Sequence, residues 1–501
     1  MPNIKLAAVL GLARVMSHSE ETAETAKNKG FLEIFVKLLS ESGSYEKKVG
    51  AFALRSVAKH SADLAQAVFD TKGVEGLIIC LMDDDTSVKE MAVCTLAQLA
   101  KYKMEQAQLL NQRGVTQHLI DFITKQYEES LKRESLVALT EIAKHSEGLG
   151  DSIMEKGGCT VITKLINSLN IYIRRQACAC LAQIARHGPT AAARISEEAL
   201  GKLVEALNDS DNFVKRNAMT CIREIMKHEE EEVNKLDKFG GPGPIIKYVS
   251  ETTGSMRLPG VVALCHYAAD QNNAKAIIDC NGILPLKEAL TNDPLIFVQS
   301  AAAWALGAIA GFSEEHTAPI VEADVHETLR TVVKRIEAEK RKDFGSGSTK
   351  KIEGGMTRTK KEEEKMTDIM VREDLRKKVF EALARIIEKC NKHDTMIDIF
   401  LEEVDNIKNE STQELLKVTL QRLGTLIREK GNCWKKFAMS GALKKLQDLR
   451  TSEDTEIKQI VNTFFQGEVE TIALQYKDEL LKLFRKKEDV LKKINSEHNN
   501  I

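Results

Sequence analysis

Apolar residues recur along the chain at the three- and four-residue spacing of amphipathic helices, and the predicted helices come in a repeating order. One phrase is written three times, as "RSVAKHSADLAQAV" (55–68), "TEIAKHSEGLGDSI" (140–153) and "AQIARHGPTAAARI" (182–195). Its sixth residue defines a marker position, and marker positions lie 41 to 43 residues apart along the chain. They are occupied by His18, His60, Tyr102, His145, His187, His228, Asp270 and Phe312.

The interior of each repeated unit predicts three helices. A short amphipathic helix follows the marker, and a Gly about twelve residues after the marker is expected to end it in the left-handed conformation. A second apolar segment such as "VEGLIICLM" follows, then a polar turn such as "DDDTS", then a longer helix that reaches the next marker. Three helices in about 42 residues indicate armadillo repeats rather than two-helix HEAT repeats. The expected glycines are Gly30, Gly73, Gly114, Gly157, Gly240 and Gly282.

We therefore expect an all-α fold, a right-handed superhelical armadillo solenoid of about ten three-helix repeats. Residues 1–336 form the first repeats, the earliest of them truncated, and residues 371–466 form the C-terminal repeats. Between them, residues 337–370 are rich in charge, Gly, Ser and Thr, and we expect a disordered insert within one repeat. Residues 467–501 are expected to form a helical cap or tail.

Composition narrows the classes of function. The net charge is −2, so no global field favours nucleic acid or membranes. The ten Cys include no CxxC pair, which argues against a zinc module or a disulfide framework and favours a reducing compartment. No apolar run reaches the length of a membrane span. Phosphate-binding, kinase, hydrolase and metalloprotease motifs do not occur, so we expect no enzyme activity, no cofactor and no metal.

A row of cations is the main candidate site. Six basic residues stand thirteen positions before successive markers, at the expected start of each third helix, where they share one surface of the solenoid. One interpretation is that they hold the adjacent loop. The other is an extended site for an elongated acidic partner, in which weak charge contacts add along a line. The row, called the cation row below, consists of Lys47, Lys89, Lys132, Arg174, Lys215 and Arg257.

Two other ligands are disfavoured by the same surface. Single-stranded nucleic acid needs aromatic side chains between the cations, and we expect none there. A nuclear-import adaptor needs Trp followed four residues later by Asn in successive third helices. Trp304 alone fits the first place, Ala308 occupies the second, and a cationic groove repels a basic peptide.

Four stretches carry a resemblance that spans nearly the whole chain in order: residues 51–90, residues 248–270 with "RLPG" at Arg257–Gly260, residues 297–325, and "KKFAMSGALKKLQDL" near the end. In them the sequence resembles the armadillo-repeat central-apparatus proteins of motile cilia and flagella, of the sperm-associated antigen type. The resemblance implies a non-enzymatic structural protein in the cytoskeleton of the axoneme. Its implied partners are other central-apparatus proteins, with microtubules as a further candidate, and neither nucleic acid nor membrane.

Two departures from that family accompany the resemblance. The charged insert is longer and more basic, and the chain opens inside a third helix, without the family's first fifty or so residues. We expect an apolar docking strip of Leu6, Val9 and Leu10 to remain open there for another protein or a second copy. The alternative is that the true start lies upstream. The competing function is a cytosolic armadillo adaptor that binds acidic peptide segments.

Overall fold

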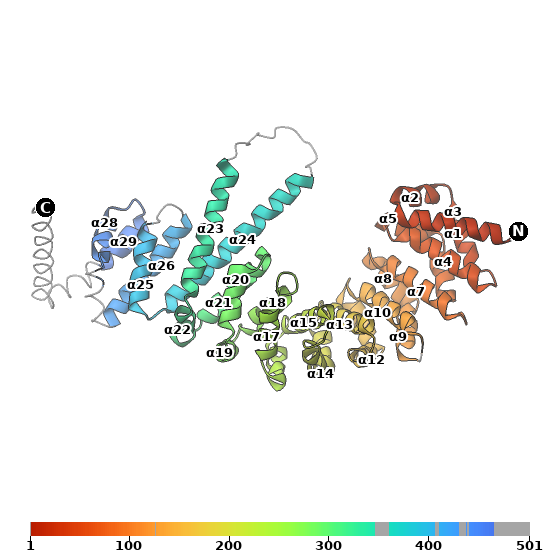
Figure 1. The fold of residues 1–501 in the computed structure, drawn as a ribbon, viewed down its shortest axis with the longest axis horizontal. Coiled ribbons are helices and arrows are strands. Elements are labelled where there is room, and N and C mark those ends of the chain that lie inside the picture. Colours follow the sequence, from red (N-terminus) through yellow and green to blue (C-terminus); the bar gives the residue numbers. More distant parts are fainter. Residues whose placement is uncertain are drawn as a thin grey trace, which may run out of the picture. The chain divides into compact units, whose positions relative to one another are not determined.

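The computed structural model describes residues 2–125, 127–345, 360–405, 410–429, 437 and 440–464. Throughout these residues the regular elements are helices (Figure 1). The chain divides into two compact units, which we call unit 1 (Met1–Asp270) and unit 2 (Gln271–Ile501). Within the described residues, no helix combines the length and the apolar character that a membrane crossing requires.

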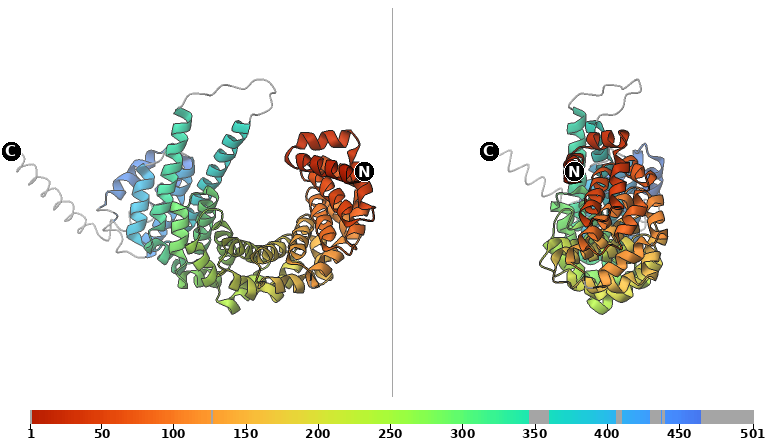
Figure 2. Two further views of the ribbon diagram at one scale, coloured as in Figure 1. Left: turned by 45° about the vertical axis from the view of Figure 1, so that its right-hand side comes forward. Right: turned by 90° about the vertical axis from the view of Figure 1, so that its right-hand side faces the viewer.

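Long third helices form the continuous layer of unit 1. Each packs against the third helix before it and the one after it, and together they follow the inner side of the curve of unit 1 (Figure 2). Their Ala and Leu side chains, such as Ala51 and Leu54, are fully buried in this layer. The third helices are α1 (Pro2–His18), α4 (Ser44–Ala58), α7 (Thr86–Ala100), α10 (Glu129–Ala143), α13 (Ile171–Ala185), α15 (Asn212–Met226) and α18 (Leu258–Tyr267).

First and second helices complete each repeat of unit 1, and the three-helix repeat predicted from the sequence is confirmed except where the continuous helix α14 replaces both. They are α2 (Glu20–Asn28), α3 (Phe31–Leu39), α5 (Ala62–Asp70), α6 (Gly73–Cys80), α8 (Met104–Gln112), α9 (Val115–Thr124), α11 (Glu147–Glu155), α12 (Gly158–Leu165), α14 (Pro189–Ala206), α16 (Glu230–Asn234), the 3₁₀ helix η1 (Lys235–Phe239) and α17 (Gly243–Glu251).

A left-handed residue separates the first and second helices. Gly30, Gly114, Gly157 and Gly240 have φ angles between 72° and 99°, as their position after the marker predicts. At two repeats the prediction is wrong by one residue, because Lys72 (φ 60°) and Asn281 (φ 59°) adopt this conformation in place of Gly73 and Gly282. Gly73 is instead a close-approach position, since a Cβ there would lie 3.1 Å from the Val68 carbonyl oxygen. Two repeats have no such Gly: Asp324 (φ 52°) adopts the left-handed conformation between α22 (Glu314–Glu322) and α23 (Val325–Gly345), whereas α14 runs on as one continuous helix.

The marker residues join successive third helices. Nε2 of His145 lies 2.6 Å from the Ala100 carbonyl oxygen, and Nε2 of His187 lies 2.7 Å from that of Lys144. His60 and His228 bond in the same way to carbonyl groups 44 and 43 residues earlier. A carbonyl oxygen only accepts, so Nε2 must donate its proton. The repeated His therefore satisfies the open C-terminal carbonyls of the preceding third helix.

Unit 2 continues the repeat and carries a long helical hairpin, α23–α24 (Figure 1). Helices α24 and α21 pack together as neighbouring third helices. The elements are α19 (Gln271–Asp279), α20 (Ile283–Asn292), α21 (Ile296–Ala310), α22 (Glu314–Glu322), α23 (Val325–Gly345), α24 (Lys360–Lys389), α25 (His393–Asp405), α26 (Glu410–Glu429), α28 (Ala442–Asp448), the 3₁₀ helix η2 (Leu449–Thr451) and α29 (Thr455–Phe464).

The hairpin corrects one expectation. Residues 337–370 were expected to be disordered, yet α23 continues to Gly345 and α24 begins at Lys360. The reason is composition, because Glu, Ala, Lys and Arg are strong helix formers even without an apolar face. Ion pairs support the helices, with Arg372 bonded to Asp368 one turn earlier and lying 3.6 Å from Glu339 on α23. The remaining residues of the insert, and the expected cap or tail at 467–501, lie outside the described residues.

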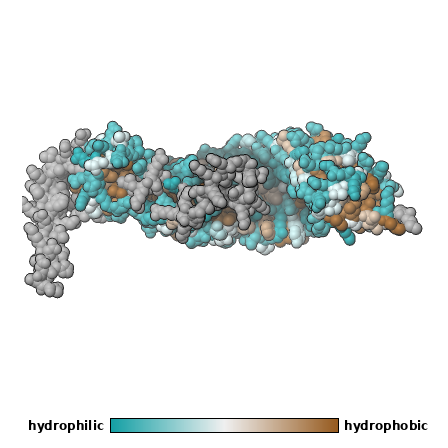
Figure 3. All heavy atoms as spheres, turned by 90° about the horizontal axis from the view of Figure 1, so that it is seen from above, coloured by the Kyte–Doolittle hydropathy of each residue, from teal (hydrophilic) through white to brown (hydrophobic). Residues whose placement is uncertain are grey.

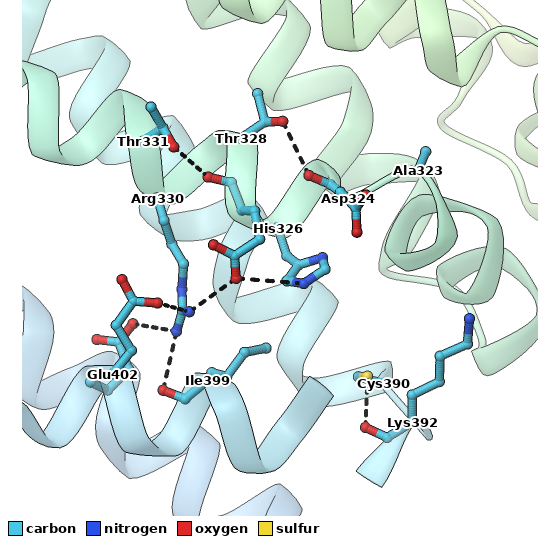
Figure 4. A network of polar contacts seen from close by, with 12 residues as sticks. Ala323, Asp324, His326, Thr328, Arg330, Thr331, Cys390, Lys392, Ile399 and Glu402 are labelled. Carbon is cyan, nitrogen blue, oxygen red and sulfur yellow. Dashed lines mark hydrogen bonds and ion pairs between the residues drawn. The ribbon is translucent and has the colours of Figure 1, made fainter. Parts of the chain in front are cut away.

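A buried polar cluster ties the base of the hairpin to the next repeat (Figure 4). The Arg330 side chain on α23 is only 5% exposed and donates to Glu403 at 3.0 Å and to the Ile399 carbonyl at 3.1 Å. It also forms an ion pair with Glu402. Helix α23 is therefore fixed to α25 by the Nη atoms of Arg330, while its buried Nε has no partner among the described residues.

Candidate partner-binding surface

The six members of the cation row have different roles in the structure: two form ion pairs within the chain, one is buried, and three remain on the surface. Lys47 Nζ lies 2.6 Å from Asp83 Oδ2, and Arg174 makes a two-point contact with Asp209 at 2.7 and 3.1 Å. Both carboxylates belong to the polar turn of the following repeat. The hydrogen bond from Lys47 lowers the pKa of Asp83, so the carboxylate stays charged at neutral pH. These two cations hold the adjacent loop, which was one of the two interpretations of the row.

Arg257 cannot belong to an exposed site. Its side chain is buried, with 2% exposure, and its Nε donates to the Thr252 carbonyl. The cause is the shortened third helix α18, which begins at Leu258, so residue 257 packs in the preceding turn and not on the helix face. The expectation that Arg257 lies in an open row is therefore wrong.

Three members of the row remain on the surface. The ammonium of Lys89 lies 5.1 Å from the ring centroid of Tyr127, a cation–π contact. Lys132 and Lys215 are half-exposed, and within the described residues neither forms an ion pair. Lys48 and Arg216, one residue further along their helices, are also half-exposed cations.

Exposed aromatic side chains at the starts of third helices were missed at the sequence level. They stand fifteen residues before the marker, two residues ahead of the cation row, so the same period locates them. Each is 54% exposed, a high value for a large apolar side chain. They are Tyr45, Tyr172, Phe213 and Phe297.

Two of these rings enclose an arginine. The guanidinium carbon of Arg175 lies 5.4 Å from the Tyr172 ring centroid and 4.8 Å from that of Phe213. Arg175 is held in place by a two-point contact with Asp211, at 2.7 and 2.5 Å. The hydrogen bond from Arg175 lowers the pKa of Asp211, so the pair stays ionised at neutral pH. We call Tyr172, Arg175 and Phe213 the aromatic stack.

The N-terminal docking strip is wrong in its residues. Leu6 and Val9 are buried, because they lie on the face of α1 that packs on α2 and α4, while Leu10 is half-buried. The exposed apolar face is turned away from these two helices, and hydrophobic atoms appear at this end of unit 1 in Figure 3. It includes Ile4, at 64% exposure, and Val15. The buried face of α1 consists of residues 6, 9, 13 and 16, whereas the open face consists of residues 4, 8, 11 and 15.

Two buried cysteines of unit 1 are chemically quiet. Burial raises the pKa of Cys94 and Cys180 to about 12, so these thiols stay protonated and are poor nucleophiles. Among the described residues, no group of three or more His, Cys, Asp or Glu side chains has a geometry able to hold a metal ion.

Comparison with known proteins places the fold. No model of a known protein family matches the chain. Protein CELLULOSE SYNTHASE INTERACTIVE 2 of Arabidopsis thaliana is 21% identical over 320 residues, which is 60% of this chain but 15% of the length of that relative. A crystal structure of an engineered protein superimposes with a TM-score of 0.65 and 23% identity, covering 92% of this chain and 94% of that one.

A designed armadillo-repeat protein, 23% identical, covers 47% of this chain and 99% of its own length at a TM-score of 0.45. The likeness over nearly the full length to the engineered protein agrees with the elements described above. Two short helices and one long helix recur with a period of about 42 residues, as in armadillo repeats. The chain therefore has the armadillo-repeat fold.

Proposed function

We propose that this chain is a non-enzymatic scaffold that binds an extended acidic segment of a partner protein along the third helices of unit 1. The observation that carries the proposal is the pair Lys132 and Lys215. Both are half-exposed, lie at the same position of their repeats, and form no ion pair with described residues. Lys48 and Arg216 add charge beside the same line. Acidic side chains of a partner gain a contact at each of these helices.

The cellular role that we propose is structural, in the central apparatus of a ciliary or flagellar axoneme, where the partners are other central-apparatus proteins. Support for this assignment comes from the sequence resemblance over four ordered stretches. A solenoid suits the role because a long surface of repeated helices makes many weak contacts in a fixed register. The competing role is a cytosolic adaptor for acidic peptides, which uses the same surface without axonemal retention.

A tagged chain expressed in a ciliated cell tests both parts. We expect the tagged chain to remain with the axoneme after detergent extraction and to be released by added salt, because screening weakens exposed charge contacts. The variant Lys132→Glu/Lys215→Glu should be released at lower salt. The matched control is Lys29→Glu/Lys238→Glu, which reverses two exposed cations outside the third helices. Release of the unmodified chain by detergent alone would favour the cytosolic adaptor and contradict the axonemal role.

A further inference from the structure

We propose that the aromatic stack Tyr172–Arg175–Phe213 is the anchor point of the partner-binding surface and that it takes an aromatic side chain carried within an acidic segment of another protein. This inference rests on the proposed function, since it names the place and the specificity of the same surface. Its main observation is separate from the cation row, because it concerns two exposed rings and Arg175 between them.

The stack is preorganised by contacts within the chain. Arg175 is clamped by Asp211, and its neighbour Arg174 is clamped by Asp209 while also donating to the Ser168 carbonyl at 2.9 Å. The turns around Leu169 and Asp211 are therefore locked to each other across two repeats. A surface that is already ordered loses little conformational entropy when a partner binds, and this loss is a main cost of association.

The stack has the composition of a binding hot spot. Tyr and Arg are enriched among the residues that dominate binding energy, and they act best within exposed apolar surface that a partner can bury. Both rings are about half exposed, and Leu169, at the tip of the turn three residues before Tyr172, is fully exposed. Arg175 fills the space between the rings. An incoming aromatic side chain therefore contacts the outer face or edge of Tyr172 or Phe213 and does not insert between them.

Charges around the stack select the segment that carries this side chain. Lys215 and Arg216 lie two and three residues after Phe213 on α15 and form no ion pair with described residues. The carboxylates Asp209 and Asp211 lie at the turn and are neutralised by Arg174 and Arg175. Acidic residues are thus favoured beside α15 but not beside the turn. A peptide can meet this pattern, whereas a nucleic-acid strand carries a phosphate at every nucleotide and cannot omit charge at the turn.

Four synthetic probes of twelve residues test the inference with the full chain: an acidic peptide with a central Trp, the same peptide with Ala in place of Trp, a neutral peptide with Trp, and the oligonucleotide dT12. Binding is measured by fluorescence anisotropy. We expect the acidic Trp peptide to bind at least tenfold more tightly than each of the other three. Tyr172→Ala and Phe213→Ala should each remove most of that advantage, while Tyr45→Ala, which alters an equally exposed ring elsewhere, should retain it.

The outcomes separate the two proposals. If both acidic peptides bind equally, or if Tyr45→Ala has the same effect as Tyr172→Ala, the anchor is wrong and the acidic-segment scaffold stands. If neither acidic peptide binds more tightly than the neutral one, both proposals fail. Preferred binding of dT12 overturns the anchor in favour of nucleic acid. A change in sedimentation on Tyr172→Ala shows a second copy on this surface and also overturns it. Circular dichroism confirms that each variant remains folded.

Discussion

Arg330 Nη2 lies 3.0 Å from Glu403 Oε1, and both side chains are nearly inaccessible to water. Burial is the largest influence on Glu403 and raises the pKa of its carboxyl group. A buried ion pair offsets its desolvation only when further hydrogen bonds are made. The Nη atoms of Arg330 make such bonds with Glu402 and the Ile399 carbonyl, whereas its buried Nε has no partner among the described residues. Removal of one partner leaves the other charge buried without compensation.

Substitution Arg330→Met should therefore lower the stability of the α23–α25 contact by about 3 kcal/mol, the cost of breaking a buried pair. The double variant Arg330→Met/Glu403→Leu should recover most of the loss, because no charge remains buried. Amide hydrogen exchange of α25 measures both. Lys334→Met is the control, since Lys334 is exposed in its pair with Glu402 and such pairs contribute less than about 1 kcal/mol. Equal effects of the Arg330 and Lys334 substitutions would contradict the prediction.

Acid should weaken the same region through His326. Burial lowers the pKa of this imidazole below its ordinary value of 6.5, so the folded state binds fewer protons than the unfolded state between the two values. Stability is therefore complete above pH 6.5 and falls as the pH drops toward the folded pKa. Glu403, with its raised pKa, acts in the opposite direction. We expect the protection factors of α23 amides, which account for the slower intrinsic exchange at low pH, to fall between pH 7.5 and 5.5, and His326→Gln to flatten this dependence; an unchanged slope would exclude His326.

The marker histidines provide a third prediction. His145 donates to the Ala100 carbonyl and so closes the end of the preceding third helix. His145→Ala should lower the free energy of unfolding by about 1 kcal/mol, the net value of a typical hydrogen bond. His118→Ala is the matched control, because His118 is half-exposed on α9 and its ring lies 6.4 Å from that of Phe122. Urea unfolding followed by circular dichroism measures both, and equal midpoint shifts would count against a role for the marker bond.

Sequence periodicity was sufficient for the repeat itself, because the marker, the glycine break and the third helix all follow from local helix chemistry. It was insufficient for the roles of individual cations. Lys47, Arg174 and Arg257 occupy equivalent sequence positions, yet the first two meet an Asp of the next turn and the third is buried by a shortened helix. The first two contacts join residues 36 and 35 positions apart, and the third depends on where α18 begins, and a one-dimensional period contains neither.

Two further features could not be predicted from the sequence: which face of α1 is open, and how far the helices of the hairpin extend. Leu6 and Val9 are apolar and would fit a buried face or an open docking face equally well. The packing of α2 and α4 against α1 decides which face is open. In residues 337–370, low hydrophobicity suggested disorder, but helix propensity and ion pairs extend α23 and α24 into the insert. The aromatic stack has a sequence signal of its own, a ring fifteen residues before the marker.

The divided cation row predicts a separation of stability from binding. Arg174→Ala should destabilise the fold, because it leaves Asp209, a largely buried carboxylate, without its two-point partner. Lys132→Ala should leave the unfolding midpoint unchanged, because Lys132 is half-exposed and bonds to no carboxylate among the described residues, but should weaken binding of an acidic peptide. Thermal unfolding and anisotropy on the same samples separate the two effects, and a fall in stability for Lys132→Ala would contradict the assignment.

The misplaced glycines give the last prediction. Lys72 has a φ of 60° in a left-handed conformation that costs a side chain about 1 kcal/mol or more, so Lys72→Gly should raise the free energy of unfolding. Gly114 has a φ of 82° with open space around it, so Gly114→Ala should lower that free energy by a similar amount, through backbone strain alone. Gly73→Ala should also be destabilising, but through the close approach to the Val68 carbonyl. Urea unfolding of the three variants decides the matter: if Lys72→Gly is destabilising while Gly114→Ala is neutral, the left-handed break does not govern the repeat.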